Sequence, residues 1–192
     1  MQKNIEHFYK TLWITKGSRF NAFRRVKRIY NWSSVSIVIF SVYIIGINLL
    51  VFLDTFSSAN SQTVITIINI VLSTFILALS LYLNGRDYKR EYQSLHQSGK
   101  DVGTIYKKIT IIKNNEKWTE DISNSIESYD NIIKSNEYNH TKVDYEKMLL
   151  DNSINEGKKK CYLINWFMYY ISPILIYLLL IVLPPLILWG IL

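Results

Sequence analysis

Few residues of this chain have the type and spacing that chemistry requires. His140 and Asp144 are four residues apart, so on a helix they would share one face and could hold a metal ion. A stable site needs a third ligand, and His7, His96 and the single cysteine, Cys161, are isolated in the sequence. The sequence also lacks the phosphate-loop, HExxH, GxSxG and CxxC motifs. We therefore predict no catalytic residue, no metal site and no cofactor, and we expect His140 to act as a helix cap or hydrogen-bonding residue.

Mild polar residues recur with helical spacing in two uncharged stretches of twenty residues, 34–53 and 64–83. We call them the polar stripe, which comprises Ser34, Ser41, Asn48, Thr66, Asn69, Ser73 and Ser80. Within each stretch the spacing places them on one helix face, and Asn48 and Asn69 would lie at the same depth in an antiparallel pair. Two interpretations remain open. The stripe either joins the two helices, at about 0.6 kcal/mol per hydrogen bond in a membrane, or lines a water-filled path in an oligomer.

The two stretches that carry the polar stripe have the length of membrane-spanning helices. Twenty residues cover about 30 Å as a helix, which is the thickness of the hydrocarbon core. Only residues 54–63 separate the stretches, so we predict a helical hairpin. Residues 161–192 form a third uncharged segment, with Pro173 and the pair Pro184-Pro185, and we predict a third span that is kinked or broken late. The absence of charged residues from the two stretches argues against a proton relay, a voltage sensor or a charge-coupled transporter.

Composition and charge support an all-α membrane protein. The 192 residues are 49% hydrophobic but only 19% charged, which excludes a disordered chain. The net charge of +7 equals the balance of residues 1–33, and basic residues Arg86, Lys89 and Arg90 directly follow the second stretch. The positive-inside rule then predicts that the N-terminus and residues 84–160 are cytoplasmic. Because topology explains the basic excess, direct nucleic-acid binding is not indicated.

Residues 1–33 form a basic amphipathic arm, which we predict to be helical in two pieces broken near Gly17. Its basic residues closest to the first stretch are Arg19, Arg24, Arg25, Lys27 and Arg28. Such a segment can lie on anionic lipid and fix the topology. It can also bind an anionic regulator such as a nucleotide, or contact a partner.

Residues 84–160 have the pattern of a cytoplasmic helical layer. A seven-residue repeat predicts that the second stretch continues as a helix into this region: Tyr88, Leu95, Val102 and Ile109. The repeat either packs against later helices of the same chain or forms a self-association seam. A further helix should end near Ser135, and Thr141 should cap a short helix through Asp144. The predicted organisation is therefore the arm (1–33), the hairpin (34–83), the cytoplasmic helices (84–160) and the C-terminal hydrophobic segment (161–192).

Three features of this chain resemble the SLATT family, the two-transmembrane effectors associated with bacterial nucleotide-signalling and related defence loci. The first is the juxtamembrane segment SRFNAFRR, residues 18–25, with Arg19 and Arg25 as its basic positions. The second is the hairpin with its very short connection. The third comprises the segments 91–109 and 137–145, which contain the family-like motif residues His96, Asn139, His140 and Asp144. The resemblance extends from about residue 18 to residue 151.

The resemblance implies a bacterial antiviral defence protein. Members of the family are thought to oligomerise in the inner membrane when a partner signals infection, and then to breach the membrane and stop growth before the virus spreads. Some are encoded beside nucleotidyltransferases or reverse transcriptases. We therefore expect a pore-forming, abortive-infection effector that is a homo-oligomer in the lipid bilayer. The alternative is a non-conducting membrane anchor or scaffold for a cytoplasmic partner enzyme.

Overall fold

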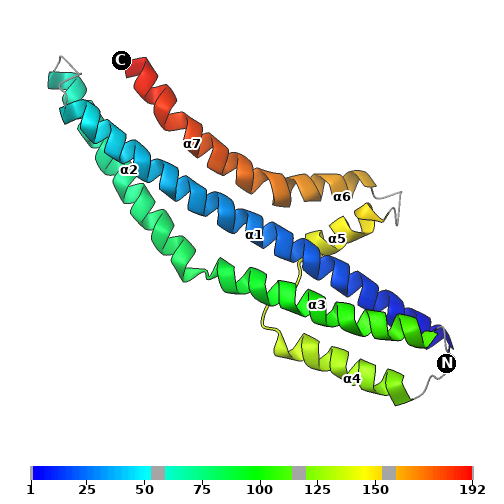
Figure 1. Ribbon diagram of the computed structural model, residues 1–192. Helices are drawn as coiled ribbons and strands as arrows, with labels where there is room; N and C mark the ends of the chain where they lie inside the picture. Colours follow the sequence, from blue (N-terminus) through cyan, green and yellow to red (C-terminus); the bar gives the residue numbers. More distant parts are fainter. Residues whose placement is uncertain (1, 53–58, 114–119, 153–158, 192) are drawn as a thin grey trace. The chain divides into compact units, whose positions relative to one another are not determined.

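The computed structural model describes residues 2–52, 59–113, 120–152 and 159–191. Across these ranges the chain is helical and has no β-strand, which confirms the predicted all-α class (Figure 1). The elements are α1 (Gln2–Phe52), α2 (Ala59–Gly85), α3 (Tyr88–Lys113), α4 (Glu120–Ser135), α5 (Lys142–Asp151), α6 (Lys159–Trp166), the π-helical turn η2 (Phe167–Ile171) and α7 (Ser172–Ile191).

The helices form two compact units. The head unit consists of Met1–Lys27 and Lys89–Tyr170, and the membrane unit consists of Arg28–Tyr88 and Ile171–Leu192. Because α1 is one unbroken helix of 51 residues, it contributes its first half to the head unit and its second half to the membrane unit.

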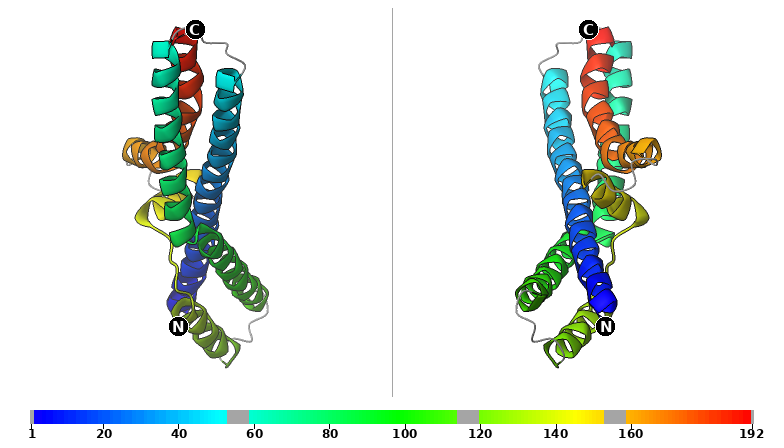
Figure 2. Two further views of the ribbon diagram at one scale, coloured as in Figure 1. Left: turned by 90° about the vertical axis from the view of Figure 1, so that its left-hand side faces the viewer. Right: turned by 90° about the vertical axis from the view of Figure 1, so that its right-hand side faces the viewer.

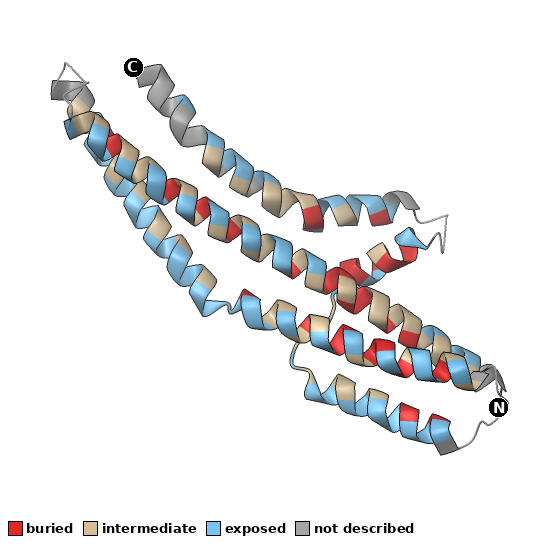
Figure 3. Ribbon diagram, viewed as in Figure 1, coloured by how far each residue is buried: buried red, intermediate tan, exposed pale blue. Residues whose placement is uncertain are grey.

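Three helical segments are long and apolar enough to cross a membrane: Ile5–Phe52, Gln62–Ile112 and Cys161–Leu179. In their most apolar windows only 17%, 6% and 12% of the residues are buried inside the chain, so most of this apolar surface needs a cover that lipid supplies. Figure 3 shows how much of α2 is exposed. The chain is therefore a membrane protein with the expected pair of spans and a third apolar helix. Much of the predicted hairpin connection, 54–63, lies outside the described residues.

Within the membrane unit, α2 runs antiparallel to the second half of α1, and α7 runs parallel to it (Figure 2). Ile47 and Ile65 are buried where α1 meets α2. Tyr43 of α1 donates a hydrogen bond to the carbonyl oxygen of Ile181 in α7, at 3.0 Å. These contacts show that the third apolar segment packs with the hairpin.

The head unit is built around the first half of α1. One apolar core joins Leu12 of α1 to α3 and α4, through the buried residues Val102, Ile105, Ile109 and Ile122. A second core joins Met148 and Leu149 of α5 and Tyr162 of α6 to Trp13 and Ile14 of α1. The repeat positions Leu95, Val102 and Ile109 are completely buried, so they pack within the chain and are closed to self-association in this structure.

The structure corrects the predicted break near Gly17, because α1 continues through it. A methyl group at Gly17 would lie 2.7 Å from Cγ of Met148 in α5. Glycine costs about 1 kcal/mol relative to alanine inside a helix, and here its missing side chain allows α5 to approach α1. Gly17 therefore does not break the helix, and it allows close packing of α5 against α1.

Two further interruptions differ from the sequence prediction. The second span does not continue unbroken into α3, because α2 ends at Gly85 and Asp87 adopts a left-handed conformation with φ 43°. Aspartate tolerates this region better than most residues, which suits it to the turn. In the third segment the α-helix is interrupted near its beginning, at the π-helical turn η2. α7 then continues to Ile191 through Pro184-Pro185, where a late break was predicted. Pro173 is the second residue of α7 and lacks the N–H that would bond to the preceding turn, which accounts for the irregular turn before it.

Candidate functional site

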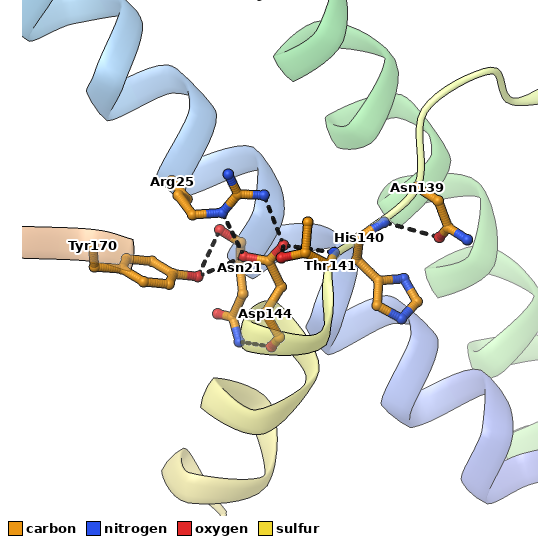
Figure 4. A network of polar contacts seen from close by, with 7 residues as sticks. All are labelled: Asn21, Arg25, Asn139, His140, Thr141, Asp144 and Tyr170. Carbon is orange, nitrogen blue, oxygen red and sulfur yellow. Dashed lines mark hydrogen bonds and ion pairs between the residues drawn. The ribbon is translucent and has the colours of Figure 1, made fainter. Parts of the chain in front are cut away.

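A buried polar network lies in the head unit where α5 begins (Figure 4). Thr141 is the N-cap residue, and its backbone N–H and its hydroxyl donate to Oδ2 of Asp144, at 2.9 and 2.8 Å. The backbone bond is the half of a capping box in which the third helical residue reaches back to the N-cap. The sequence pattern predicted this start, and the structure adds that Asp144 is fully buried.

α1 supplies the positive charge that Asp144 faces. Arg25 donates from Nε to Oδ1 of Asp144 at 3.0 Å and from Nη2 to Oδ2 at 2.9 Å, so the pair is bidentate. Asn21, one helical turn before Arg25, donates from Nδ2 to the backbone carbonyl of Asp144 at 3.1 Å. Spacing by four places both residues on the same face of α1. They therefore hold the first turn of α5 against α1.

The third apolar segment also reaches this network. Tyr170, in the π-helical turn η2, donates its hydroxyl to Oδ1 of Asp144 at 2.9 Å, and this hydroxyl lies 3.2 Å from the carbonyl oxygen of Asn21. Tyr170 is buried although it belongs to a segment that has the composition of a membrane span. Asp144 thus joins α1, α5 and η2 within the head unit.

The charge state of Asp144 follows from these contacts. Burial alone would raise the pKa of the carboxyl group, but the hydrogen bonds and charge of Arg25 and the hydrogen bonds from Thr141 outweigh it, so the pKa of Asp144 is lowered. The ionised carboxylate is satisfied by Arg25, Thr141 and Tyr170 together. It has no unoccupied direction for a metal ion, and among the described residues no group of three potential ligands gathers.

His140 does not join Asp144 as a paired ligand. Figure 4 shows its ring pointing away from the carboxylate. Its backbone N–H donates to Oδ1 of Asn139 at 2.9 Å, and Nδ1 of the ring is buried without a partner among the described residues. Burial and the charge of Arg19 lower the pKa of His140, so its neutral form is favoured. The fourth family-like position, His96, lies on α3 and contacts the rings of Phe20 and Phe23, with ring centroids 5.7 and 4.4 Å away.

The five basic residues of the arm that lie closest to the first stretch have different environments. Arg19 is 1% exposed and donates to the hydroxyl of Ser98 on α3, while Arg25 is held by Asp144. These two side chains therefore serve contacts inside the head unit and are not part of a lipid-facing surface. The exposed members are Arg24, which donates to Oδ1 of Asn21 at 2.8 Å, and Lys27 and Arg28.

The structure brings two members of the polar stripe together. Nδ2 of Asn69 donates to Oδ1 of Asn48 at 2.6 Å, between α1 and α2. The hydroxyls of Ser41, Thr66 and Ser73 instead donate to carbonyl oxygens four residues earlier in their own helices. Ser80 is exposed and Ser34 is half-buried. Most of the stripe therefore lies at the surface of the membrane unit.

Comparison with known proteins assigns the chain to a family. Residues 1–191 match the SMODS and SLOG-associating 2TM effector domain, family 5. The chain belongs to this SLATT family. No curated protein and no solved structure matches it. The family match includes the third apolar segment, so it extends well beyond residues 18–151, which carry the motif resemblance.

Membership of the SLATT family indicates the general function of the chain. The SLATT domain is a two-transmembrane effector domain linked to antiviral defence, named for its association with SMODS and SLOG partners, and is not a known catalytic fold. The Arg25–Asp144 contact unites two segments that carried the resemblance. Sequence reasoning missed Asn21 and Tyr170 as members of this network. The spacing of Asn21 and Arg25 was a usable signal, whereas Tyr170 was hidden in an apolar segment.

Proposed function

We propose that this SLATT protein is a membrane effector of a bacterial antiphage, abortive-infection system. When a partner senses infection, the SLATT protein oligomerises and permeabilises the inner membrane. The observation that supports this proposal is the exposed polar stripe on two helices that also expose many large apolar side chains. The N-terminus and residues 84–160 face the cytoplasm, as the charge distribution predicts. There they meet the partner, for which an enzyme encoded nearby, a nucleotidyltransferase or a reverse transcriptase, is the candidate.

The physical reason for oligomerisation is the cost of polar groups in hydrocarbon. Asn48 is exposed, and Oδ1 of Asn69 is buried without a partner among the described residues. Asn48 shares the exposed surface of α1 with Ile45 and Leu49, which are 61% and 56% exposed and suit lipid. An amide without full hydrogen bonding is costly in lipid. A second copy, or water in a path between copies, supplies the missing partners.

The alternative, a non-conducting anchor, draws on the same geometry. The hydroxyls of the stripe bond to their own helices and the two asparagines bond to each other, so a single copy already satisfies many of these groups. On this alternative the head unit binds a partner enzyme and the membrane unit only holds it at the bilayer. Stoichiometric recovery of a soluble enzyme, with no leakage from liposomes that contain the purified protein, favours the anchor.

The decisive experiment records membrane potential during phage infection, in cells that express the protein with its genomic neighbours. The wild type should depolarise the membrane. The double variant Asn48→Leu/Asn69→Leu should insert normally but not depolarise it. The matched control, Ile45→Leu/Ile70→Leu, changes exposed apolar residues of the same helices and should behave as the wild type.

Two results would count against the proposal. Depolarisation by the asparagine variant at the wild-type level removes the pair from the path. An unchanged potential with the wild type, under infection that the system resists, removes permeabilisation altogether and favours the anchor.

A further inference from the structure

A basic groove lies between α1 and α3 of the head unit, separate from the Asp144 network. It has a volume of about 360 Å³, which is near the lower end of the range for small-molecule sites. Its lining consists of Lys16, Phe20, Gly99, Lys100, Gly103, Thr104 and Lys107. Lys16 and Phe20 come from α1 and are four residues apart, so they share one helix face. The other five come from α3, and most of them are three, four or seven residues apart, so they also share a face.

The charge of the groove has one sign. Three lysines line it and no carboxylate does. Among the described residues, none of these three ammonium groups forms an ion pair, whereas the neighbouring Lys108 pairs with Asp121 at 3.4 Å. The nearest acidic residue on α3, Asp101, accepts a hydrogen bond from Gln97 and does not line the groove. Three positive charges around one concave surface attract an anion of several charges.

Local packing positions one of the lysines. The stem of Lys16 lies across Gly103, whose added Cβ would be 3.6 Å from Cε of Lys16. Its ammonium group lies 5.2 Å from the centroid of the Tyr106 ring, within cation–π range. Lys100 and Lys107 are exposed and can turn toward a ligand. Phe20 adds an aromatic surface, which suits a ligand with a planar apolar part.

We propose that this groove binds a small ligand that carries two or more phosphate groups, such as a nucleotide. Ammonium groups bind phosphate oxygens as point charges, and three of them match the charge of a di- or triphosphate. The ligand would connect α1 to α3 and so act on the helix that the head unit shares with the membrane unit. The site does not depend on permeabilisation, because binding can be measured whether or not the protein conducts.

The test is calorimetric titration of the full-length protein, in nanodiscs of neutral lipid, with adenosine triphosphate and with inorganic triphosphate. The wild type should bind at least one of these probes with saturation at physiological salt. The variant Lys16→Gln/Lys100→Gln/Lys107→Gln should bind roughly a thousandfold more weakly, since each lysine contributes about a factor of ten. The single variant Lys107→Gln, at an exposed position, should already show about a tenfold loss if the triple variant does not fold.

The control has the same change in net charge at exposed lysines outside the groove, Lys89→Gln/Lys108→Gln/Lys134→Gln, and should bind as the wild type. Equal weakening in both triple variants means non-specific attraction and overturns the proposal. Absence of saturable binding by either probe also overturns it. A parallel arm uses nanodiscs with anionic phospholipid. If only that lipid binds in a groove-dependent way, the phosphate belongs to a lipid headgroup and the soluble ligand is excluded.

Discussion

Removing the charge of Asp144 should loosen α5 from α1, because the substitution leaves Arg25 without its counter-ion. The side chain of Asp144 is completely buried and that of Arg25 is 13% exposed. Removing one partner of a buried ion pair costs about 3–5 kcal/mol, since the other charge remains desolvated. We expect Asp144→Asn to lower the free energy of unfolding of the head unit by an amount in that range. Tyr170→Phe, which removes one hydrogen bond to the carboxylate, should cost about 1–3 kcal/mol.

The measurement is hydrogen exchange by mass spectrometry on the full-length protein in detergent. Amides of α5 should lose protection in Asp144→Asn, while those of α4, which contributes no residue to the Asp144 network, serve as the internal reference. The matched control is Glu137→Gln, which removes the same charge from an exposed pair with Arg90, where both side chains are about two-thirds exposed. Exposed ion pairs contribute little, so this control should exchange like the wild type.

A double replacement measures the energy of the interaction between Arg25 and Asp144 apart from their contacts with other residues. Arg25→Met/Asp144→Leu removes both charges, so it should cost much less than the sum of the two single replacements. Additive losses would refute the account of a coupled pair. So would a loss below about 1 kcal/mol in Asp144→Asn, because a buried uncompensated arginine is inconsistent with so small a change.

Acid should reproduce the effect of Asp144→Asn. The folded pKa of Asp144 lies below its unfolded value of 3.8, so the folded state binds fewer protons there than the unfolded state. The stabilisation by Asp144 is then complete above the unfolded pKa and is lost as the pH falls through the lower folded pKa. The Asp144→Asn variant should lack this part of the acid dependence, and an identical acid profile for the two proteins would contradict the assignment.

Two packing predictions test the rest of the head unit. Gly17→Ala should lower the thermal unfolding temperature, because the new methyl group would lie 2.7 Å from Cγ of Met148. At Gly99 the nearest atom to an added methyl group is 3.4 Å away, so Gly99→Ala should raise the unfolding temperature through a gain in helix propensity of up to about 1 kcal/mol. The opposite order of the two unfolding temperatures would contradict the packing. Leu12→Ala, at a completely buried core position, should cost about 2–5 kcal/mol in denaturant unfolding, and Ile111→Ala, at a position 64% exposed, should cost far less.

The membrane part of this fold was predictable because it depends on composition over long segments. A bilayer fixes the length of an uncharged stretch, so residues 34–53 and 64–83 predict two spans without knowledge of their contacts. The antiparallel arrangement then follows from the short connection, and it places Asn48 opposite Asn69, where the structure has a hydrogen bond. Helix starts are local as well, which is why Thr141 and Asp144 predicted the beginning of α5.

The errors arose where one residue type has two structural uses. A glycine in a helical sequence favours a break by its propensity, but it also permits close approach of a second helix, and only the position of Met148 shows that Gly17 has the second use. The same holds for Arg19 and Arg25. A basic juxtamembrane segment is typical of lipid contact, yet a carboxylate more than a hundred residues later in the chain makes Arg25 part of a buried pair.

The network around Asp144 depends on such long-range contacts throughout. Asn21, Arg25, Asp144 and Tyr170 come from three parts of the chain, and the last of them lies in a segment that hydropathy assigns to the membrane. Hydropathy averages over a window, so it cannot separate a tyrosine that ends the head unit from the apolar residues that follow it. The π-helical turn is the local feature that marks the change, since it ends two residues before Pro173. A proline near the start of an apolar segment can therefore indicate where one compact unit of the chain ends, which here is Tyr170.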